Sequence, residues 1–300
     1  MAADAGNQDY ELYYDPSLVG AIIFTVIFGL VSFLHTYQLL RTRTWYFIPF
    51  VIGGYFELIG YIGRVLGSQE TPDWSLGPYI VQTLLILIAP ALFAASMYME
   101  LGRIIRLTDG AVHSVIRLRW LTKIFVLGDV MSFLMQGSGG SLIASGKSSS
   151  TKKGEAMIIG GLGVQILFFG FFVIVSLIFN VRMDRTPTYK IMGGGRAAAI
   201  WKKHLYTLYS GSLLILVRSL FRVVEYAQGN DGYLVSHEVY LYVFDAALMS
   251  TTMVLFAVVH PSEVNALLRD DGYGKAVHKV ILLHAMGVAG GNRGGHDVGV

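Results

Sequence analysis

Charged and amide side chains recur inside segments of this sequence that are otherwise apolar. They are the residues most suited to chemistry, because acids, arginines and amides can bind a charged or polar ligand. An ionisable side chain at the centre of a bilayer costs about 2.5–3.5 kcal/mol even on the lenient insertion scale, so it faces the protein interior and marks a ligand or ion pathway. The candidate substrate-binding or translocation residues are Glu57, Arg64, Gln82, Asp129, Gln136, Arg218, Arg222, Glu225, Glu238 and Asp245.

The spacing of these residues places them on shared helix faces. Residues seven apart lie two turns apart on one face, about 10 Å along the helix axis, so most of their ion-pair partners must come from other helices. This spacing occurs in Glu57 with Arg64, Asp129 with Gln136, and Glu238 with Asp245, while Arg218, Arg222 and Glu225 follow one stripe at i, i+4 and i+7.

Arg218 and Arg222 carry like charges one helical turn apart and therefore need carboxylates from other helices. Two interpretations of the resulting cluster are open. In the first, the charges line a polar cavity that opens to the exterior and binds a ligand. In the second, they form a structural salt-bridge network that locks the helices together. Both hold at once if some pairs are gates that break when the cavity changes access. The candidate carboxylates for the two arginines are Glu57, Asp129, Glu238 and Asp245.

The composition shows what kind of element positions these charges. The chain is 54% hydrophobic and 14% charged, with a mean hydropathy of +0.55, whereas a soluble domain carries about 25% charged residues. In lipid, only helices and closed barrels satisfy their backbone groups, and a helix needs about 20 apolar residues to cross. We therefore predict an all-α membrane protein, a seven-transmembrane helix bundle with spans at 18–40, 45–67, 78–102, 120–143, 156–180, 204–227 and 238–260.

The basic residues predict the orientation of the bundle. Sixteen of them fall in segments on one side of the predicted membrane and three on the other, and the side richer in lysine and arginine is cytoplasmic. This places the N-terminus outside and the C-terminus in the cytoplasm. The predicted organisation is an extracellular segment 1–17, a transmembrane domain 18–260 and a partly disordered cytoplasmic tail 261–300, in which 277–288 is either a short amphipathic helix or a frayed tail.

A proline and several glycines predict how the helices pack. Pro90 lies inside the third predicted span and should kink that helix or free a carbonyl. Glycines in the second span allow another backbone to approach closely, and we interpret them as packing residues. They are Gly53, Gly54, Gly60 and Gly63.

Several kinds of chemistry find no support in the sequence. The chain has no cysteine, which excludes disulfides, thiolate metal sites and cysteine nucleophiles. Residues 146–148 resemble the end of a phosphate-binding loop, but Ser141 stands where that motif needs glycine. Only His237 falls near the cluster of charges, which is too few histidines for a zinc hydrolase. We predict no catalytic residue, no cofactor, no metal and no nucleic-acid partner, and hence not an enzyme.

Several segments together form a recognisable signature. They span the chain in order from residue 14 to Pro261 and closely resemble the fungal RTA-like family of lipid-translocating exporters. The segments are 56–64 (FELIGYIGR), 89–92 (APAL), 94–99 (AASMYM), 128–140 with Asp129 and Gln136, 218–229 with Arg218, Arg222 and Glu225, 237–245, and 260–261.

The resemblance implies seven transmembrane helices and a role in moving amphipathic lipids. Members are associated with export or translocation of sphingoid long-chain bases, with resistance to toxic amphiphiles and, in one branch, with porphyrin uptake. We therefore expect an integral protein of the plasma membrane, or of an endomembrane, whose partners are membrane lipids or amphipathic small molecules. The acids would receive the amine of a long-chain base, while the arginines hold the acids when the site is empty or meet a phosphate.

Two other functions remain as alternatives. A seven-helix receptor or sensor for a lipid-like ligand shares the topology, but the sequence lacks Asp-Arg-Tyr in the third span and Asn-Pro-x-x-Tyr in the seventh. An intramembrane lipid hydrolase lacks its metal ligands. The absence of a nucleotide motif leaves proton coupling, downhill flipping and regulation of another transporter open as the source of energy.

Overall fold

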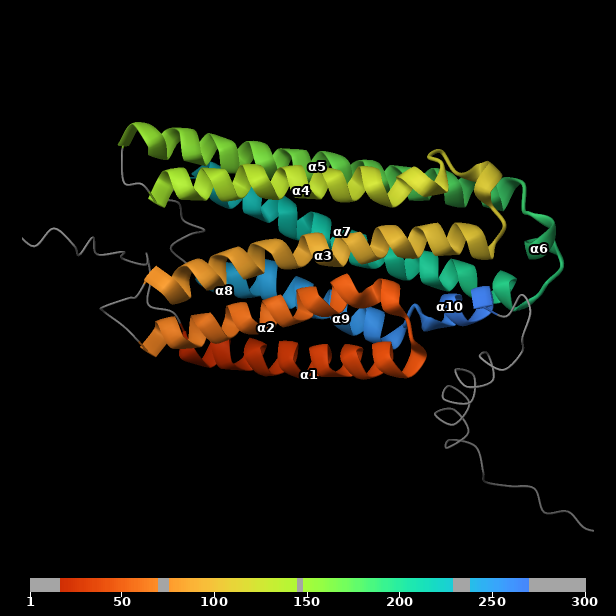
Figure 1. The fold of residues 1–300 in the computed structure, drawn as a ribbon, viewed down its shortest axis with the longest axis horizontal. Helices are drawn as coiled ribbons and strands as arrows, with labels where there is room; N and C mark the ends of the chain where they lie inside the picture. The colour runs from red at the N-terminus through yellow and green to blue at the C-terminus, as the bar shows by residue number, and fades with distance from the viewer. Residues whose placement is uncertain (1–16, 70–75, 145–147, 229–237, 270–300) are drawn as a thin grey trace, which may run out of the picture.

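The computed structural model describes residues 17–69, 76–144, 148–228 and 238–269, and within these ranges the secondary structure is helical, with no strand. The long helices run up and down beside one another in one elongated bundle (Figure 1). Apart from Ser17, the predicted extracellular segment 1–17 lies outside the described residues, as does the predicted amphipathic helix 277–288.

Six long helices and one broken helix form the bundle. They are α1 (Leu18–Thr42), α2 (Ile48–Gln69), α3 (Leu76–Leu107), α4 (Leu118–Ala144), α5 (Ser148–Arg185), α7 (Arg196–Gln228), and the succession of α8 (Glu238–Leu241), η3 (Tyr242–Ala246) and α9 (Ala247–Val258).

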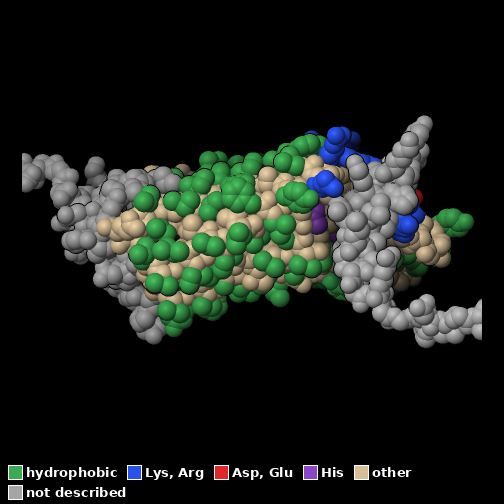
Figure 2. Space-filling model, turned by 90° about the horizontal axis from the view of Figure 1, so that it is seen from below, with side chains coloured by type: hydrophobic (Ala, Val, Ile, Leu, Met, Phe, Trp, Pro, Cys, Tyr) green, Lys and Arg blue, Asp and Glu red, His purple; other side chains and the backbone are tan. Residues whose placement is uncertain are grey.

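The two ends of the bundle differ. At one end lie the short elements η1 (Trp45–Phe47), η2 (Ala111–His113), α6 (Tyr189–Met192) and α10 (Ser262–Arg269), and we call it the α10 end. At the other, where α1 and α8 begin, lies what we call the α8 end. Figure 2 shows hydrophobic side chains over the middle of one face, and lysine and arginine side chains gathered toward the α10 end.

Within the described residues, six helical segments are long and apolar enough to cross a membrane, as expected of an integral membrane protein. They are Leu18–Thr42, Trp45–Gln69, Gln82–Leu107, Thr151–Arg185, Arg196–Gln228 and Glu238–Arg269. The 27-residue helix α4 packs beside α5 but is not among them. Lys123, Asp129, Gln136 and a second half rich in glycine and serine lower its hydropathy. The seven-span count and the orientation therefore stay predictions.

Glycines allow close contact where the sequence predicted it and also between α4 and α5. A Cβ added to Gly60 would lie 2.6 Å from Ile86 Cγ1, and one added to Gly53 would lie 3.0 Å from the carbonyl oxygen of Ala89, so α2 packs directly on the backbone of α3. Between α4 and α5 the approach is mutual, because a Cβ on Gly139 or on Gly154 would lie 2.6 Å from the other residue's carbonyl oxygen. Such approaches are typical of helix packing in membranes.

Replacing Gly139 with alanine should destabilise the bundle, because the new methyl group collides with backbone that cannot rotate away. We expect Gly139→Ala to cost about 1–3 kcal/mol, the usual penalty of overpacking, and to lower the melting temperature of the detergent-purified protein, followed by tryptophan fluorescence. Gly140→Ala is the matched control, since a Cβ there meets nothing within 4 Å. Equal melting temperatures for the two variants would contradict this packing.

Candidate functional site

Asp245 is the acid that pairs with both α7 arginines. It lies in η3, a π-helical turn between α8 and α9, and such turns are rare and frequently found at functional sites. One carboxylate oxygen, Oδ1, accepts a hydrogen bond from Nε of Arg218, and Oδ2 accepts one from Nη2 of Arg222 at 3.1 Å. Asp245 is 1% exposed. A single buried carboxylate therefore bridges two guanidinium groups from successive turns of α7.

A second partner of Arg218 comes from the proline in α3. Because Pro90 has no N–H, the carbonyl of Ile86, four residues earlier, lacks its helical donor. Nη2 of Arg218 donates to that carbonyl at 2.9 Å. The sequence predicted that Pro90 would kink the helix or free a carbonyl, and the freed carbonyl is confirmed. Arg218 thus joins α3, α7 and η3 in the middle of the bundle.

A further ion pair, between Arg64 and Glu238, lies closer to the α8 end. Nη2 of Arg64 on α2 donates to Oε1 of Glu238 at 2.7 Å, and Nε of Arg64 lies 3.3 Å from the hydroxyl of Tyr242. Oε2 of Glu238 accepts the backbone N–H of Ser17 at 2.7 Å, which ties the start of α1 to α8. These contacts hold three helices together where the chain enters the bundle.

Glu57 is the one predicted acid of this region whose carboxylate makes no hydrogen bond. It lies on α2, is 0% exposed, and interacts electrostatically with Asp245, Arg218 and Arg222. Arg222 also pairs with Glu225 on its own helix, at 2.9 Å. We call seven of the predicted residues the arginine cluster: Glu57, Arg64, Arg218, Arg222, Glu225, Glu238 and Asp245.

The arginine cluster contains four carboxylates and three guanidinium groups, so with all of them ionised it carries one net negative charge. Buried charges without compensation are strongly unfavourable. The acids other than Glu57 accept hydrogen bonds from arginine. Glu57 is therefore the one carboxylate of the cluster that accepts no hydrogen bond from an arginine.

The remaining predicted residues do not join the arginine cluster. Asp129 lies on α4 and interacts with Tyr98 of α3, with neither arginine of α7 among its partners. Gln136 donates to Ser132 Oγ at 2.7 Å and to Oε1 of Gln165 on α5 at 3.3 Å. Gln82 is half-buried on α3, and its carbonyl faces Gly60 of α2.

The predicted cavity open to the exterior stays a prediction. Two of the residues predicted to line it are buried, since Arg218 and Arg64 are each 2% exposed. The segments that join the helices at the α8 end, 70–75, 145–147 and 229–237, lie outside the described residues.

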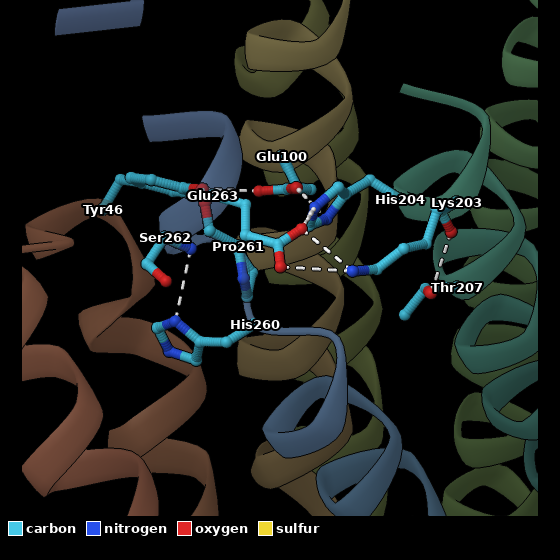
Figure 3. A network of polar contacts seen from close by, with 9 residues as sticks. All are labelled: Tyr46, Glu100, Lys203, His204, Thr207, His260, Pro261, Ser262 and Glu263. Atoms are coloured by element: carbon cyan, nitrogen blue, oxygen red, sulfur yellow. Dashed lines mark hydrogen bonds and ion pairs between the residues drawn. The ribbon is translucent and has the colours of Figure 1, made fainter. Parts of the chain in front are cut away.

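Sequence reasoning missed a second polar network, at the α10 end (Figure 3). Its centre is Glu100, which is 1% exposed on α3 and accepts a hydrogen bond from the hydroxyl of Tyr46. His204 of α7 lies between two acids, with Nδ1 3.5 Å from Glu100 Oε1 and Nε2 3.0 Å from Glu263 Oε2. Lys203 Nζ reaches Glu263 at 2.9 Å. The network ties α10 to α3 and α7. The sequence signal that could have revealed it is Glu100 itself, an acid near the end of the predicted span 78–102.

Comparison with known proteins confirms the resemblance seen in the sequence motifs. The family described as RTA1 like protein matches residues 50–266. Protoporphyrin uptake protein 1 of Saccharomyces cerevisiae is 36% identical over 291 residues, 84% of this chain and 92% of that protein. Protein RTA1 of the same organism is 36% identical over 281 residues, 85% and 86% of the two chains. The sphingoid long-chain base transporter RSB1 from a strain of that yeast is 25% identical over 276 residues, 82% and 72%. No solved structure matches the chain.

Removing the charge of Asp245 should destabilise the bundle more than removing that of Glu225. Asp245→Asn leaves the buried Arg218 and the partly buried Arg222 without their shared counter-ion, and breaking a buried pair costs about 3–5 kcal/mol in other proteins. Glu225 pairs with Arg222 alone, and its side chain is 13% exposed, so Glu225→Gln should cost less. Melting temperatures in detergent measure the difference, and an equal or larger loss in Glu225→Gln would contradict the assignment of Asp245.

Proposed function

Because the chain belongs to the RTA1-like family of membrane proteins, we propose that it moves amphipathic lipids with a cationic headgroup, such as sphingoid long-chain bases, across the membrane. The observation that carries this proposal is the buried carboxylate of Glu57, which accepts no hydrogen bond from the arginines around it. A long-chain base consists of one ammonium group on an apolar tail. Its ammonium would bind Glu57 and balance the cluster, while its tail remains among apolar side chains or lipid.

The same hydrogen bonds favour a cation over an anion. One relative is named for uptake of protoporphyrin, which carries two carboxylates. An anion would need an arginine to release an acid, and each arginine of the cluster donates to a carboxylate. A cation finds the carboxylate of Glu57 without breaking any of these bonds. Cationic amphiphiles are therefore the substrate class we propose.

Access to Glu57 requires the bundle to open at one end and then at the other. The pair of Arg64 and Glu238 joins α2 to α8 at the α8 end, and the contacts of Glu263 join α10 to α7 at the other end. The ion pair at the α8 end and the ion pairs of Glu263 at the other end can break and reform as the helices move. In this proposal they are the two gates, and the protein performs no chemistry on the lipid.

In this proposal the protein lies in the plasma membrane and crosses it seven times. The α8 end faces the outside of the cell and the α10 end faces the cytoplasm. Export of toxic amphiphiles from the inner leaflet would then confer resistance to them. The described basic residues at the α10 end are consistent with this orientation. They are Arg41, Arg43, Arg103, Arg106, Arg117, Arg119, Arg182, Arg185, Lys190, Arg196, Lys202, Lys203 and Arg269.

Cysteine labelling tests the orientation and the crossing of α4, because the chain has no cysteine of its own. Arg117→Cys and Lys153→Cys flank α4 and lie at opposite ends of the bundle. A membrane-impermeant maleimide added to intact cells should label position 153, and should label position 117 only after the cells are permeabilised. Labelling of both positions from outside would show that α4 does not cross, and the reverse pattern would invert the orientation.

Reconstitution tests the function. The purified protein in liposomes should move a fluorescent long-chain base between leaflets, and Glu57→Gln should slow this movement roughly ten- to hundredfold, the effect of losing one charged hydrogen bond. Glu155→Gln on α5 is the matched control for the same chemical change elsewhere. An N-acylated, uncharged analogue of the base should not be moved.

Three outcomes would contradict the proposed function. If the Glu57→Gln variant moved the fluorescent base at the wild-type rate, Glu57 would not be the binding site of the ammonium group. Binding of the base without movement would favour a receptor or sensor, and cleavage of its headgroup would favour an enzyme. The melting temperature of each variant shows whether it is folded.

A further inference from the structure

A second buried carboxylate lies outside the arginine cluster. Asp129 is 5% exposed, and among the described residues the phenol of Tyr98 is the one polar side chain that interacts with its carboxylate. It lies 11 residues after Leu118 and 15 before Ala144, the two ends of α4, which is about 17 and 22 Å along the helix axis. Asp129 is therefore close to the middle of the bundle.

The surroundings of Asp129 are neutral. From α3, the buried phenol of Tyr98 is the titratable group that interacts with it. The ring of Tyr98 packs against Phe125 of α4 at 5.2 Å and Phe172 of α5 at 4.6 Å between centroids. From α5, Phe168 contacts the position next to Asp129, at Gly128. No lysine or arginine of the described residues is among the groups that interact with Asp129.

This environment contrasts with that of Glu57. Glu57 interacts with Arg218 and Arg222, whose charges can offset its own, and with Asp245, which carries the same charge. Asp129 faces a phenol and aromatic rings, and an ionised carboxylate without a counter-ion in such a place costs several kcal/mol or more. A neutral carboxylic acid avoids that cost and can donate a hydrogen bond to a nearby oxygen. The surroundings of Asp129 therefore favour the protonated acid while it is buried.

Polar side chains continue from Asp129 along the same face of α4. Ser132 Oγ donates to the carbonyl of Gly161 at 2.7 Å, and Gln136 contacts Ser132 and Gln165. Oε1 of Gln136 is buried without a hydrogen-bond partner. This stripe lies at the interface of α4 and α5 and leads toward the α8 end. When the helices separate and water enters, these polar side chains and the water can form a hydrogen-bonded path for a proton.

We propose that Asp129 is a proton-binding site, distinct from the arginine cluster, whose proton is exchanged with the α8 end when the bundle opens there. Proton binding is then tied to the conformation, because Asp129 can ionise only when α3, α4 and α5 let water reach it. The coupling of this proton to substrate movement rests on the proposed function, and proton binding itself does not. A proton gradient becomes the source of energy for the movement.

Carbodiimide labelling tests proton binding without any variant. Hydrophobic carbodiimides react with protonated carboxyl groups inside membranes, so mass spectrometry of wild-type protein treated with dicyclohexylcarbodiimide should find an adduct at Asp129, and pretreatment at high pH should reduce it. Asp184 is the comparison, because it is exposed and paired with Lys202. Modification of Asp184 with an unmodified Asp129 would overturn the proposal.

A pH gradient across the liposomes tests the coupling. Wild-type protein should accumulate the fluorescent base in response to the gradient, and Asp129→Asn should still equilibrate the base but lose that response. Asp129→Glu restores an acid and should restore the response, which separates proton exchange from packing. A gradient response in Asp129→Asn would overturn the coupling, as would its absence in the wild type. If no protein-dependent movement occurs at all, the proposed function fails, and the labelling still decides whether Asp129 holds a proton.

Discussion

The ion pairs between Asp245 and the two α7 arginines are the interaction on which the rest of the bundle depends. Between helices in lipid there is no hydrophobic driving force like that in water, so specific hydrogen bonds and close packing hold the helices together. Arg218 takes one oxygen of Asp245 and the carbonyl that Pro90 leaves free, while Arg222 takes the other oxygen. Each group would be a liability alone, because a buried arginine, acid or carbonyl without a partner is unfavourable. Together they fix how α3, α7 and the broken helix lie.

This arrangement also determines what the site can bind. With Asp245 shared by two arginines, the carboxylate of Glu57 accepts no hydrogen bond, and under the proposed function it is the group that receives a cation. The pairs of Arg64 with Glu238 and of Glu263 with Lys203 lie toward opposite ends. A bundle joined by a few ion pairs at each end and by a deep cluster between them can open one end while the other stays closed. That is the property that alternating access requires.

The sequence predicted more about which residues matter than about how they pair. Charges inside apolar spans are visible in a sequence, and so is the effect of Pro90 on the carbonyl four residues earlier. The choice of Asp245 over Asp129 as the arginines' partner was not predictable, because it depends on helix rotation and on the π-helical turn of η3, for which we identified no sequence signal. Asp129 fits the spacing rule equally well, yet its face of α4 turns toward Tyr98.

The network around Glu100 was missed for a related reason. A charge near the end of a span costs less than one at its middle, so Glu100 did not stand out. Its partners His204 and Glu263 come from segments more than 100 residues away in the chain, and only the folded bundle brings them together. Mean hydropathy also describes α4 poorly. Its polar residues lower the mean hydropathy of the segment, although the helix is 27 residues long.

The most direct test of the account is an experimental structure of the protein in lipid with a sphingoid long-chain base bound. The account predicts that the amine nitrogen lies about 3 Å from a carboxylate oxygen of Glu57, with Asp245 still bridging Arg218 and Arg222. An amine bound at the Glu100 network, or on the lipid-facing surface with Glu57 still enclosed and unoccupied, would contradict the central claim.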